Sequence, residues 1–249
     1  MAPRFLPPAV TGAPYSGEET QEHTQTLSDG THITQGIMQR TMYRDSLGRT
    51  RVERPLMGPH LSYLNAPPSP IIVEITDPVA GVQYTLDTEK KIAHRVTVQA
   101  QPAGDRAGGL VAITRNGLGV LSAGPVAPPP PPPPPNVISR PAFRRPQFTT
   151  EKLGTQMIEG VLAEGERQTT TIPEGEQGND RPFNVTMETW TSPELKMVVL
   201  SKSSDPRSGE SIMKLTNISR AEPDASLFQL PPDYTIVDET GQFTITYGN

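Results

Sequence analysis

Residues 71–98 read IIVEITDPVAGVQYTLDTEKKIAHRVTV, and this stretch sets the pattern of the chain. Three short runs alternate between apolar and polar residues, and they are separated by turn formers, first from Asp77 to Gly81 and then from Asp87 to Lys90. Alternation with a period of two places successive side chains on opposite faces of a β-strand, and turns about every ten residues are typical of antiparallel sheets. The stretch predicts three consecutive antiparallel strands.

The same pattern continues on both sides of this stretch. Asp29-Gly30 and the run DSLG at 45–48 separate alternating runs before it, and similar runs fill the chain beyond residue 149. The helix signal is confined to about one turn near residues 223–227. We therefore predict an all-β protein: a single, strongly curved antiparallel sheet, a half-barrel or open barrel, with about a dozen strands and little helix.

Charge divides the chain into three parts. Residues 1–99 carry 9 basic and 10 acidic side chains, residues 100–148 carry 5 and 1, and residues 149–249 carry 8 and 16. The basic middle part also holds eight consecutive prolines, Pro128 to Pro135, after a stretch rich in Gly and Ala. Proline fixes φ and has no N–H to donate, so this octad is expected to form a stiff polyproline II rod.

These differences predict the domain organisation. Residues 1–16 are expected to be a disordered tail, 17–99 the first half of a β domain, 100–148 a disordered Pro/Gly-rich insertion or linker, and 149–249 the second half of the same domain. The proline rod is interpreted as a spacer. The alternative is a ligand for recognition modules with aromatic grooves.

Composition and motifs exclude several classes. The chain of 249 residues has no cysteine, which removes disulfides and thiolate metal sites, and no run of about 18 apolar residues that would span a membrane. The start, MAPRFLPPAV, shows no secretory signal as written. Nucleophile-elbow, HExxH and P-loop motifs are missing, so no catalytic residue, no metal and no cofactor is predicted. The net charge of −5 argues against nucleic acid.

The histidines offer little for chemistry. If Asp29-Gly30 is a two-residue loop, Leu27 lies opposite His32, and His23 is then about four residues away along the strands, too far to share a metal with it. His94 lies among apolar neighbours, either as a hydrogen-bonded core residue or as part of a pocket wall. A hydrolytic enzyme built on His94 remains a minor third hypothesis.

Apolar rows predict a ligand-binding wall. Alternation groups the apolar residues of several strands into rows, and we expect these rows to line one concave surface that holds an apolar ligand. The predicted wall consists of Val82, Tyr84, Leu86, Ile92, His94, Val96, Phe183, Val185, Met187 and Phe228.

A group of arginines predicts an anion site beside this wall. Pairing around residues 45–48 sets Arg44 opposite Arg49 and Met42 opposite Arg51, so that Arg40, Arg44, Arg49 and Arg51 share a face. Guanidinium groups suit carboxylates and phosphates, and the face is either a head-group patch or a solvated strand face.

A family resemblance appears at the C-terminal end. The run IMKLTNISRAEPDASLFQLPPDYTI at 212–236 resembles the closing segment of bacterial lipoprotein carriers and outer-membrane lipoprotein-sorting proteins. The matching positions are Leu215, Asn217, Ile218, Pro223, Asp224, Leu227, Phe228, Pro231, Pro232 and Tyr234. The resemblance implies a curved antiparallel half-barrel that holds acyl chains or a protein segment in the cell envelope.

Together these observations predict a non-enzymatic, exported envelope protein whose sheet binds a lipid or acyl chain, a lipoprotein, or an extended segment of another envelope protein. The expected protein is a monomer, peripheral to the membrane at most, and periplasmic or extracellular, with the cytoplasm left open. The alternative is a structural or sensory module that docks partners by strand addition or through its proline rod.

Overall fold

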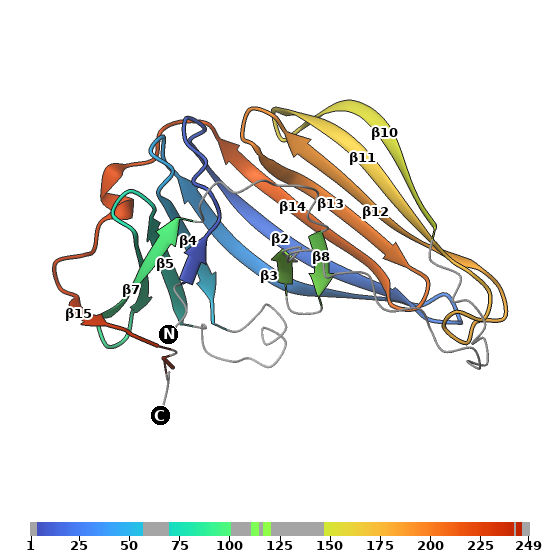
Figure 1. The fold of residues 1–249 in the computed structure, drawn as a ribbon, viewed down its shortest axis with the longest axis horizontal. Helices are drawn as coiled ribbons and strands as arrows, with labels where there is room; N and C mark the ends of the chain where they lie inside the picture. The colour runs from blue at the N-terminus through green and yellow to red at the C-terminus, as the bar shows by residue number, and fades with distance from the viewer. Residues whose placement is uncertain are drawn as a thin grey trace, which may run out of the picture.

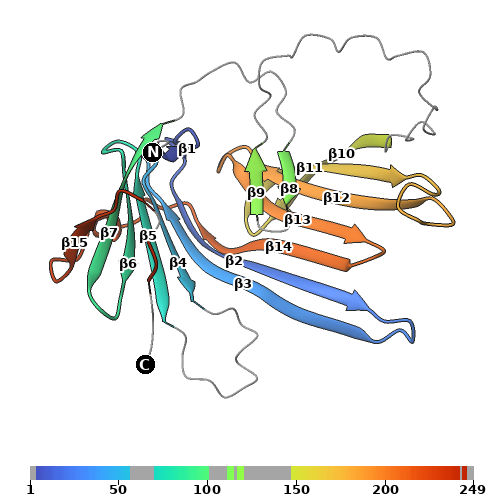
Figure 2. The same ribbon diagram turned by 60° about the horizontal axis from the view of Figure 1, so that its bottom comes forward.

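The computed structural model describes residues 4–56, 70–100, 111–114, 117–120, 147–241 and 243–245. Thirteen strands form one open sheet, which confirms the predicted all-β, curved antiparallel fold. The strands β4–β7 stand at a steep angle to β10–β14, so the sheet is strongly curved (Figures 1 and 2). The strands of this sheet are β1 (Arg4–Leu6), β2 (Tyr15–Thr26), β3 (His32–Arg44), β4 (Thr50–Pro55), β5 (Ile71–Asp77), β6 (Val82–Asp87), β7 (Ile92–Ala100), β10 (Gln147–Ile158), β11 (Val161–Ile172), β12 (Phe183–Ser192), β13 (Met197–Asp205), β14 (Gly209–Ser219) and β15 (Thr235–Asp238).

The sheet consists of two meanders that meet along β2 and β14. The spatial order is β1-β7-β6-β5-β4-β3-β2-β14-β13-β12-β11-β10, with β15 also paired to β7. At the junction, Glu19 lies opposite Leu215. The outer edge of β7 takes two short parallel strands end to end, β15 along Ile92–Arg95 and β1 along Val98–Ala100. Both termini of the chain therefore contribute to the same edge.

Two hairpin loops set the register in the first meander. The β2–β3 loop has five residues, 27–31, and two backbone hydrogen bonds close it: Leu27 N donates to Thr31 O (2.8 Å) and Gly30 N donates to Leu27 O (3.0 Å). The β3–β4 loop, residues 45–49, has the same two bonds. Gly30 (φ 86°) and the glycine at 48 (φ 85°) occupy the left-handed region. In each loop the glycine adds one residue to the turn, as in a bulged hairpin, and shifts the strand register by one residue.

The predicted registers were therefore wrong by one residue. Thr26, not Leu27, lies opposite His32, and Arg44 lies opposite Thr50. Because side chains alternate, a one-residue shift moves a whole strand's side chains to the other face.

The predicted disordered tail covers residues 1–16, and its described residues, from Arg4 onward, include parts of two strands. β1 pairs with β7, β2 begins at Tyr15, and the side chains of Ala13 and Tyr15 are 4% and 3% exposed. The Nε of Arg44 donates to the carbonyl of Ala13 (2.9 Å), and Gly12 N donates to Ser46 O (3.0 Å). These contacts hold residues 12 and 13 against β3 and the β3–β4 loop.

The predicted insertion contributes little to the large sheet. Its described residues include β8 (Val111–Thr114) and β9 (Gly117–Val120), which pair with each other in a separate two-stranded sheet. The predicted proline rod, Pro128 to Pro135, lies outside the described residues.

Two apolar clusters form the core. The larger one lies near the β3–β4 and β12–β13 turns and contains Tyr15, Ile158, Val161, Ala163, Trp190, Leu195, Val199 and Leu215. The smaller one lies on β5–β7 and contains Val73, Ile75, Leu86 and Ala93, with Leu230 and Tyr234 packed against it. The core is therefore placed at the ends of the strands and at one flank of the sheet.

Several residues of the C-terminal run at 212–236, on which the family resemblance rests, have local structural roles. Asn217 has a positive φ (53°) where the β14–β2 pairing is irregular, a conformation that Asn tolerates better than most residues. Asp224 accepts a hydrogen bond from Ser226 N (2.8 Å) and begins the expected single turn, the 3₁₀ helix η2 (Ala225–Phe228). Phe228 is buried. Within the described part of the chain, no helix is long and apolar enough to cross a membrane.

Candidate functional site

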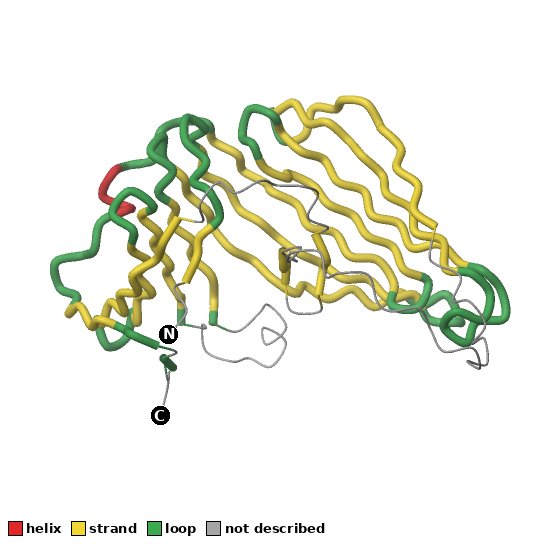
Figure 3. Tube along the Cα trace, in the orientation of Figure 1, coloured by secondary structure: helices red, strands yellow, loops and turns green. Residues whose placement is uncertain are grey.

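The long central strands extend well beyond the core. Among the described side chains, none is buried in residues 20–26, 32–43, 183–189, 200–205 or 209–214. Figure 3 shows these strands running between two groups of turns. The larger core cluster lies near one of these groups. Because a sheet is ordinarily stabilised by burying one of its faces, these segments are the part of the described structure that is open to a ligand.

Cross-strand pairs show which side chains share each face of these segments. Met187 lies opposite Ser203, Ser203 opposite Ser211, and Ser211 opposite His23. The neighbouring row joins Thr189, Ser201, Met213, Gln21 and Met38 in the same way. We call this surface the neutral face: Gln21, His23, Met38, Phe183, Val185, Met187, Thr189, Ser201, Ser203, Ser211 and Met213.

The opposite surface, the charged face, carries ion pairs from strand to strand. Arg167 lies 3.4 Å from Glu151 and 3.0 Å from Glu188, and Lys202 lies 4.0 Å from Glu188. Trp190 Nε1 donates to Glu188 (2.7 Å), and this hydrogen bond, with help from Arg167, lowers the pKa of the Glu188 carboxyl. Paired charges of this kind are typical of a solvent-exposed sheet face.

The neutral face has a different chemistry. Its half-buried methionine, valine and phenylalanine side chains are interleaved with Ser, Thr and Gln, and it is bordered by Glu166 on β11 and by the Glu19–Arg40 ion pair. Removing such a surface from water costs less free energy than removing the ion pairs of the charged face. The surface suits an uncharged or mostly apolar ligand.

The predicted wall does not form one surface. In the β6–β7 pair, Thr85 lies opposite His94 and Tyr84 opposite Arg95, so the rows of β6 and β7 point to opposite sides of the sheet. The continuous register places Ile92, His94, Val96, Phe183, Val185 and Met187 on the side of the neutral face, and Val82, Tyr84 and Leu86 on the side of the charged face.

Both sides are apolar at β7 because the C-terminal segment wraps around this flank. On one side Leu230 packs on the small cluster, where Leu86 is 1% exposed. On the other side His94 lies 2.7 Å from Glu239 and stacks on Phe243 at 4.6 Å. Leu86 and Phe228 are core residues, which removes them from the candidate wall.

The predicted four-arginine face does not form either. Because Arg44 lies opposite Thr50 and Tyr43 opposite Arg51, Arg40 and Arg44 point to one side of the sheet and Arg51 to the other. The five-residue loop that contains Arg49 causes this difference.

Arg44 is a structural residue. It is 6% exposed, donates to the carbonyls of Ala13 (2.9 Å) and Leu195, and lies 4.7 Å from the centre of the Tyr15 ring. Burial lowers the pKa of this guanidinium. Arg44 thus joins the N-terminal segment, β3 and the β12–β13 turn.

Arg49 and Arg51 are also engaged by the fold. Arg49 Nε lies 2.5 Å from Asp45, a carboxylate that is 1% exposed. Arg51 Nε donates to Glu53 (2.6 Å), and its Nη1 donates to the carbonyl of Leu227 (3.0 Å). Both arginines hold turns and the C-terminal segment in place.

Arg40 is the arginine that borders the neutral face. Its Nη2 lies 2.7 Å from Glu19, whereas its Nε is buried and has no hydrogen-bond partner in the described part of the chain. With 31% of its side chain exposed, against 20% for Arg49 and 15% for Arg51, Arg40 is more accessible to an anionic or carbonyl oxygen than these two arginines.

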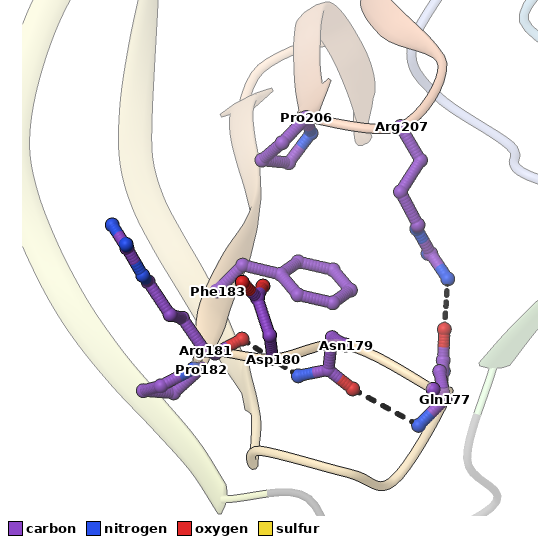
Figure 4. Close-up of a pocket in the computed structure, with 9 residues that line it drawn as sticks. Gln177, Asn179, Asp180, Arg181, Pro182, Phe183, Pro206 and Arg207 are labelled. Atoms are coloured by element: carbon purple, nitrogen blue, oxygen red, sulfur yellow. Dashed lines mark hydrogen bonds between the residues drawn. The ribbon is translucent and has the colours of Figure 1, made fainter.

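A shallow hollow lies at the other end of the strands (Figure 4). It has a volume of about 430 Å³ and is lined by Gln177, Gly178, Asn179, Asp180, Arg181, Pro182, Phe183, Pro206 and Arg207. Arg207 donates to Asp205 (2.9 and 2.6 Å) and to Gln177, and lies 5.1 Å from the centre of the Phe183 ring. These contacts fasten the β11–β12 loop to the β13–β14 turn at the end of the neutral face.

The histidines that the structure describes are dispersed. His32 bonds to Thr26 (3.0 Å), His94 to Glu239, and His23 lies opposite Gln35, while His60 is outside the described residues. In the described part of the chain, no group of three or more His, Asp and Glu side chains could hold a metal ion.

The sequence analysis identified three residues of the neutral face and missed most of it. It followed apolar rows and so found Phe183, Val185 and Met187, but not the uncharged polar rows of β13 and β14. The available signal was Ser201 and Ser203 at alternate positions, with charges confined to the positions between and beyond them.

Comparisons with known proteins find structural similarity only. No family model and no curated protein matches the chain. An uncharacterized conserved protein from Thermus thermophilus matches with a TM-score of 0.39 and 10% identity over 91% of both chains. MucB in the Pseudomonas aeruginosa MucA/MucB complex matches with a TM-score of 0.40 and 10% identity over 91% of this chain and 58% of that one.

The neighbours include the family that the C-terminal residues resemble. A LolA superfamily protein from Nitrosomonas europaea matches with a TM-score of 0.30 and 10% identity over 89% of this chain and 92% of that one. At such identities the function of a neighbour does not transfer to this chain.

Proposed function

We propose that this chain is a non-enzymatic binding protein of the cell envelope, periplasmic or extracellular, whose neutral face receives a lipid, an acyl chain or a lipidated or extended segment of a partner. One observation carries the proposal. Residues 20–26, 32–43, 183–189, 200–205 and 209–214 of the long strands bury no described side chain, yet one face of these segments is free of the ion pairs that cover the other.

The binding energy would come mainly from burial of apolar surface. A ligand that covers roughly 300 Å² of apolar surface gains about 7.5 kcal/mol before the entropic cost of association. Met38, Met187 and Met213 suit this role because unbranched thioether side chains adapt to irregular apolar shapes. Ser201 and Ser203 add hydroxyl groups that would bond to ester or amide groups of the ligand.

Arg40 would orient the ligand. Its side chain is 31% exposed at the border of the neutral face, where it pairs with the buried Glu19. A carboxylate, phosphate or carbonyl oxygen of the ligand would accept a hydrogen bond from this guanidinium.

The alternative function has two forms, docking of partners through the proline rod and docking by strand addition. The proline rod lies outside the described residues, whereas strand addition finds an open edge at β10, which pairs only with β11 among the described strands.

The test compares adjacent residues on opposite faces. Met213 belongs to the neutral face, and Ile212, 39% exposed, points to the other side. Binding of dansyl-undecanoic acid is followed by fluorescence, and thermal stability is measured with and without phospholipid vesicles. We expect Met213→Glu to weaken binding at least tenfold, since a charge would be buried against the ligand, and Ile212→Glu to change it less than twofold.

Two results would contradict the proposal: no binding of the probe and no thermal shift with vesicles for the unmodified chain, or equal losses in the two variants. Circular dichroism of both variants confirms that the sheet is intact.

A further inference from the structure

The two outermost long strands of the large sheet, β7 and β10, differ in how their outer sides are paired. The β7 edge is covered by β15 and β1, one after the other. The β10 edge runs for twelve residues, Gln147–Ile158, and pairs on its inner side with β11 and with no other described strand. An edge of this length exposes a row of backbone donors and acceptors that favours pairing with another strand.

The side chains of β10 mark where pairing is possible. A register irregularity lies between Lys152 and Gly154, which limits a regular ladder to the residues before it. In that part Phe148 is 63% exposed, and Thr149, Thr150, Glu151 and Lys152 are exposed as well. An exposed phenylalanine on an open edge is a surface that a second strand would cover.

We propose that β10 pairs with β10 of a second copy of this chain, antiparallel and centred on Thr150. Two identical strands pair side by side in this way about a two-fold axis perpendicular to the sheet, so one residue lies opposite its own copy. A centre at Glu151 or Lys152 would set like charges opposite each other, which is destabilising. The centre at Thr150 avoids this.

The register centred on Thr150 also makes favourable pairs. Phe148 lies opposite Lys152 of the partner subunit, which places the lysine stem and its ammonium group over the ring, and Thr149 lies opposite Glu151 of the partner subunit. A centre at Thr149 would set Phe148 opposite a threonine and leave Lys152 without a partner in the ladder. The charge pattern thus selects one register.

The arrangement closes at two copies. The edge beyond β7 consists of two short strands, β1 of three residues and β15 of four, so each chain offers one long open edge. Since the contact joins the same strand of both copies, it does not propagate into a filament. The axis keeps corresponding faces on the same side. Phe148 pairs with Thr170, and Thr170 with Val185, so the neutral faces of the two copies would form one continuous surface.

The absence of cysteine makes a direct test possible. In Thr150→Cys, the two thiols would face each other across the axis, and mild oxidation should trap a disulfide-linked dimer. Gln156→Cys is the matched control, because it is exposed on the same strand but lies beyond the irregularity. We expect at least a tenfold faster yield of dimer from Thr150→Cys.

A second variant tests the register. Phe148→Lys in the Thr150→Cys background would set lysines opposite each other, and trapping should fall at least tenfold while circular dichroism stays unchanged. Sedimentation of the unmodified chain should show concentration-dependent dimers, weak ones given the small contact. Equal trapping of Thr150→Cys and Gln156→Cys, or trapping that Phe148→Lys does not change, would overturn the proposal. It does not depend on the ligand of the neutral face.

Discussion

Replacing Gly165 with alanine tests how Trp190 packs in the larger core cluster. Gly165 lies opposite Trp190 in the β11–β12 pair and outside the left-handed region, so the backbone accepts alanine without strain. The added Cβ would lie 2.7 Å from Cη2 and Cζ3 of the Trp190 ring and 2.9 Å from Cε3. Since carbon atoms pack at about 3.5–4.0 Å, the ring must move by about 0.8 Å or more.

The expected cost follows from what that movement disturbs. Trp190 is 7% exposed and its Nε1 donates to Glu188 at 2.7 Å. Overpacking of a core costs about 1–3 kcal/mol, and weakening a hydrogen bond to a charged group adds a part of its ~1.5–3 kcal/mol. We expect Gly165→Ala to lower the free energy of unfolding by about 2–4 kcal/mol.

Urea unfolding measures this cost directly, because Trp190 is the one tryptophan of the chain and its emission reports its own burial. Emission of the folded variant should shift to longer wavelength. In a Trp190→Leu background, followed by circular dichroism, the alanine should cost less than about 0.5 kcal/mol. A stability equal to that of the unmodified chain, or the same cost in both backgrounds, would refute the packing argument.

Two further predictions concern Tyr15 and Arg44. Burial raises the pKa of Tyr15 to about 12, so the folded state favours the neutral phenol. Below pH 10, the ordinary pKa, the phenol is neutral in both states and the free energy of unfolding is unaffected. As pH rises from 10 to 12, the unfolded state ionises first, and the free energy of unfolding falls by up to about 2.7 kcal/mol. Tyr15→Phe should remove that part of the alkaline loss in urea titrations, and parallel losses in both proteins would count against it. Arg44→Lys should cost about 2–4 kcal/mol, since lysine cannot reproduce the two bonds to the carbonyls of Ala13 and Leu195. Arg207→Lys, at the half-exposed pair with Asp205, serves as control and should cost less than about 1 kcal/mol in the same denaturant series, and a similar cost at both sites would show that Arg44 has no special role.

Much of the fold was predictable because each strand carries its own signal. Alternation in residues 71–98 and turn residues at 77–81 and 87–90 predicted β5, β6 and β7, and the motif from Leu215 to Phe228 predicted the helical turn η2. These are local properties, determined by neighbours in the sequence.

Register and the pairing of distant segments were not predictable in the same way. A glycine in the left-handed region at 30 or 48 adds one residue to a hairpin, and a periodic pattern does not reveal it. Apolar residues on β6 and β7 looked like parts of one wall, because the sequence does not show that the C-terminal segment covers both sides of this flank. Most of the neutral face was missed for the same reason, since its polar rows depend on the pairing of β13, β14 and β2.

The junction of β2 and β14 has a consequence for how the chain could be divided. Each meander is built from neighbouring hairpins. Two ladders join the meanders: β2 pairs with β14, whose residues are nearly two hundred positions away in the sequence, and β15 pairs with β7. Within residues 101–146, the described strands β8 and β9 pair with each other and not with the large sheet. A cut between residues 120 and 147 would therefore break no described ladder of the large sheet, and a covalent connection raises the local concentration of one half near the other without adding contacts to that ladder. The sheet is thus suited to complementation, in which two separately made fragments, cut in this stretch, reassemble along β2 and β14.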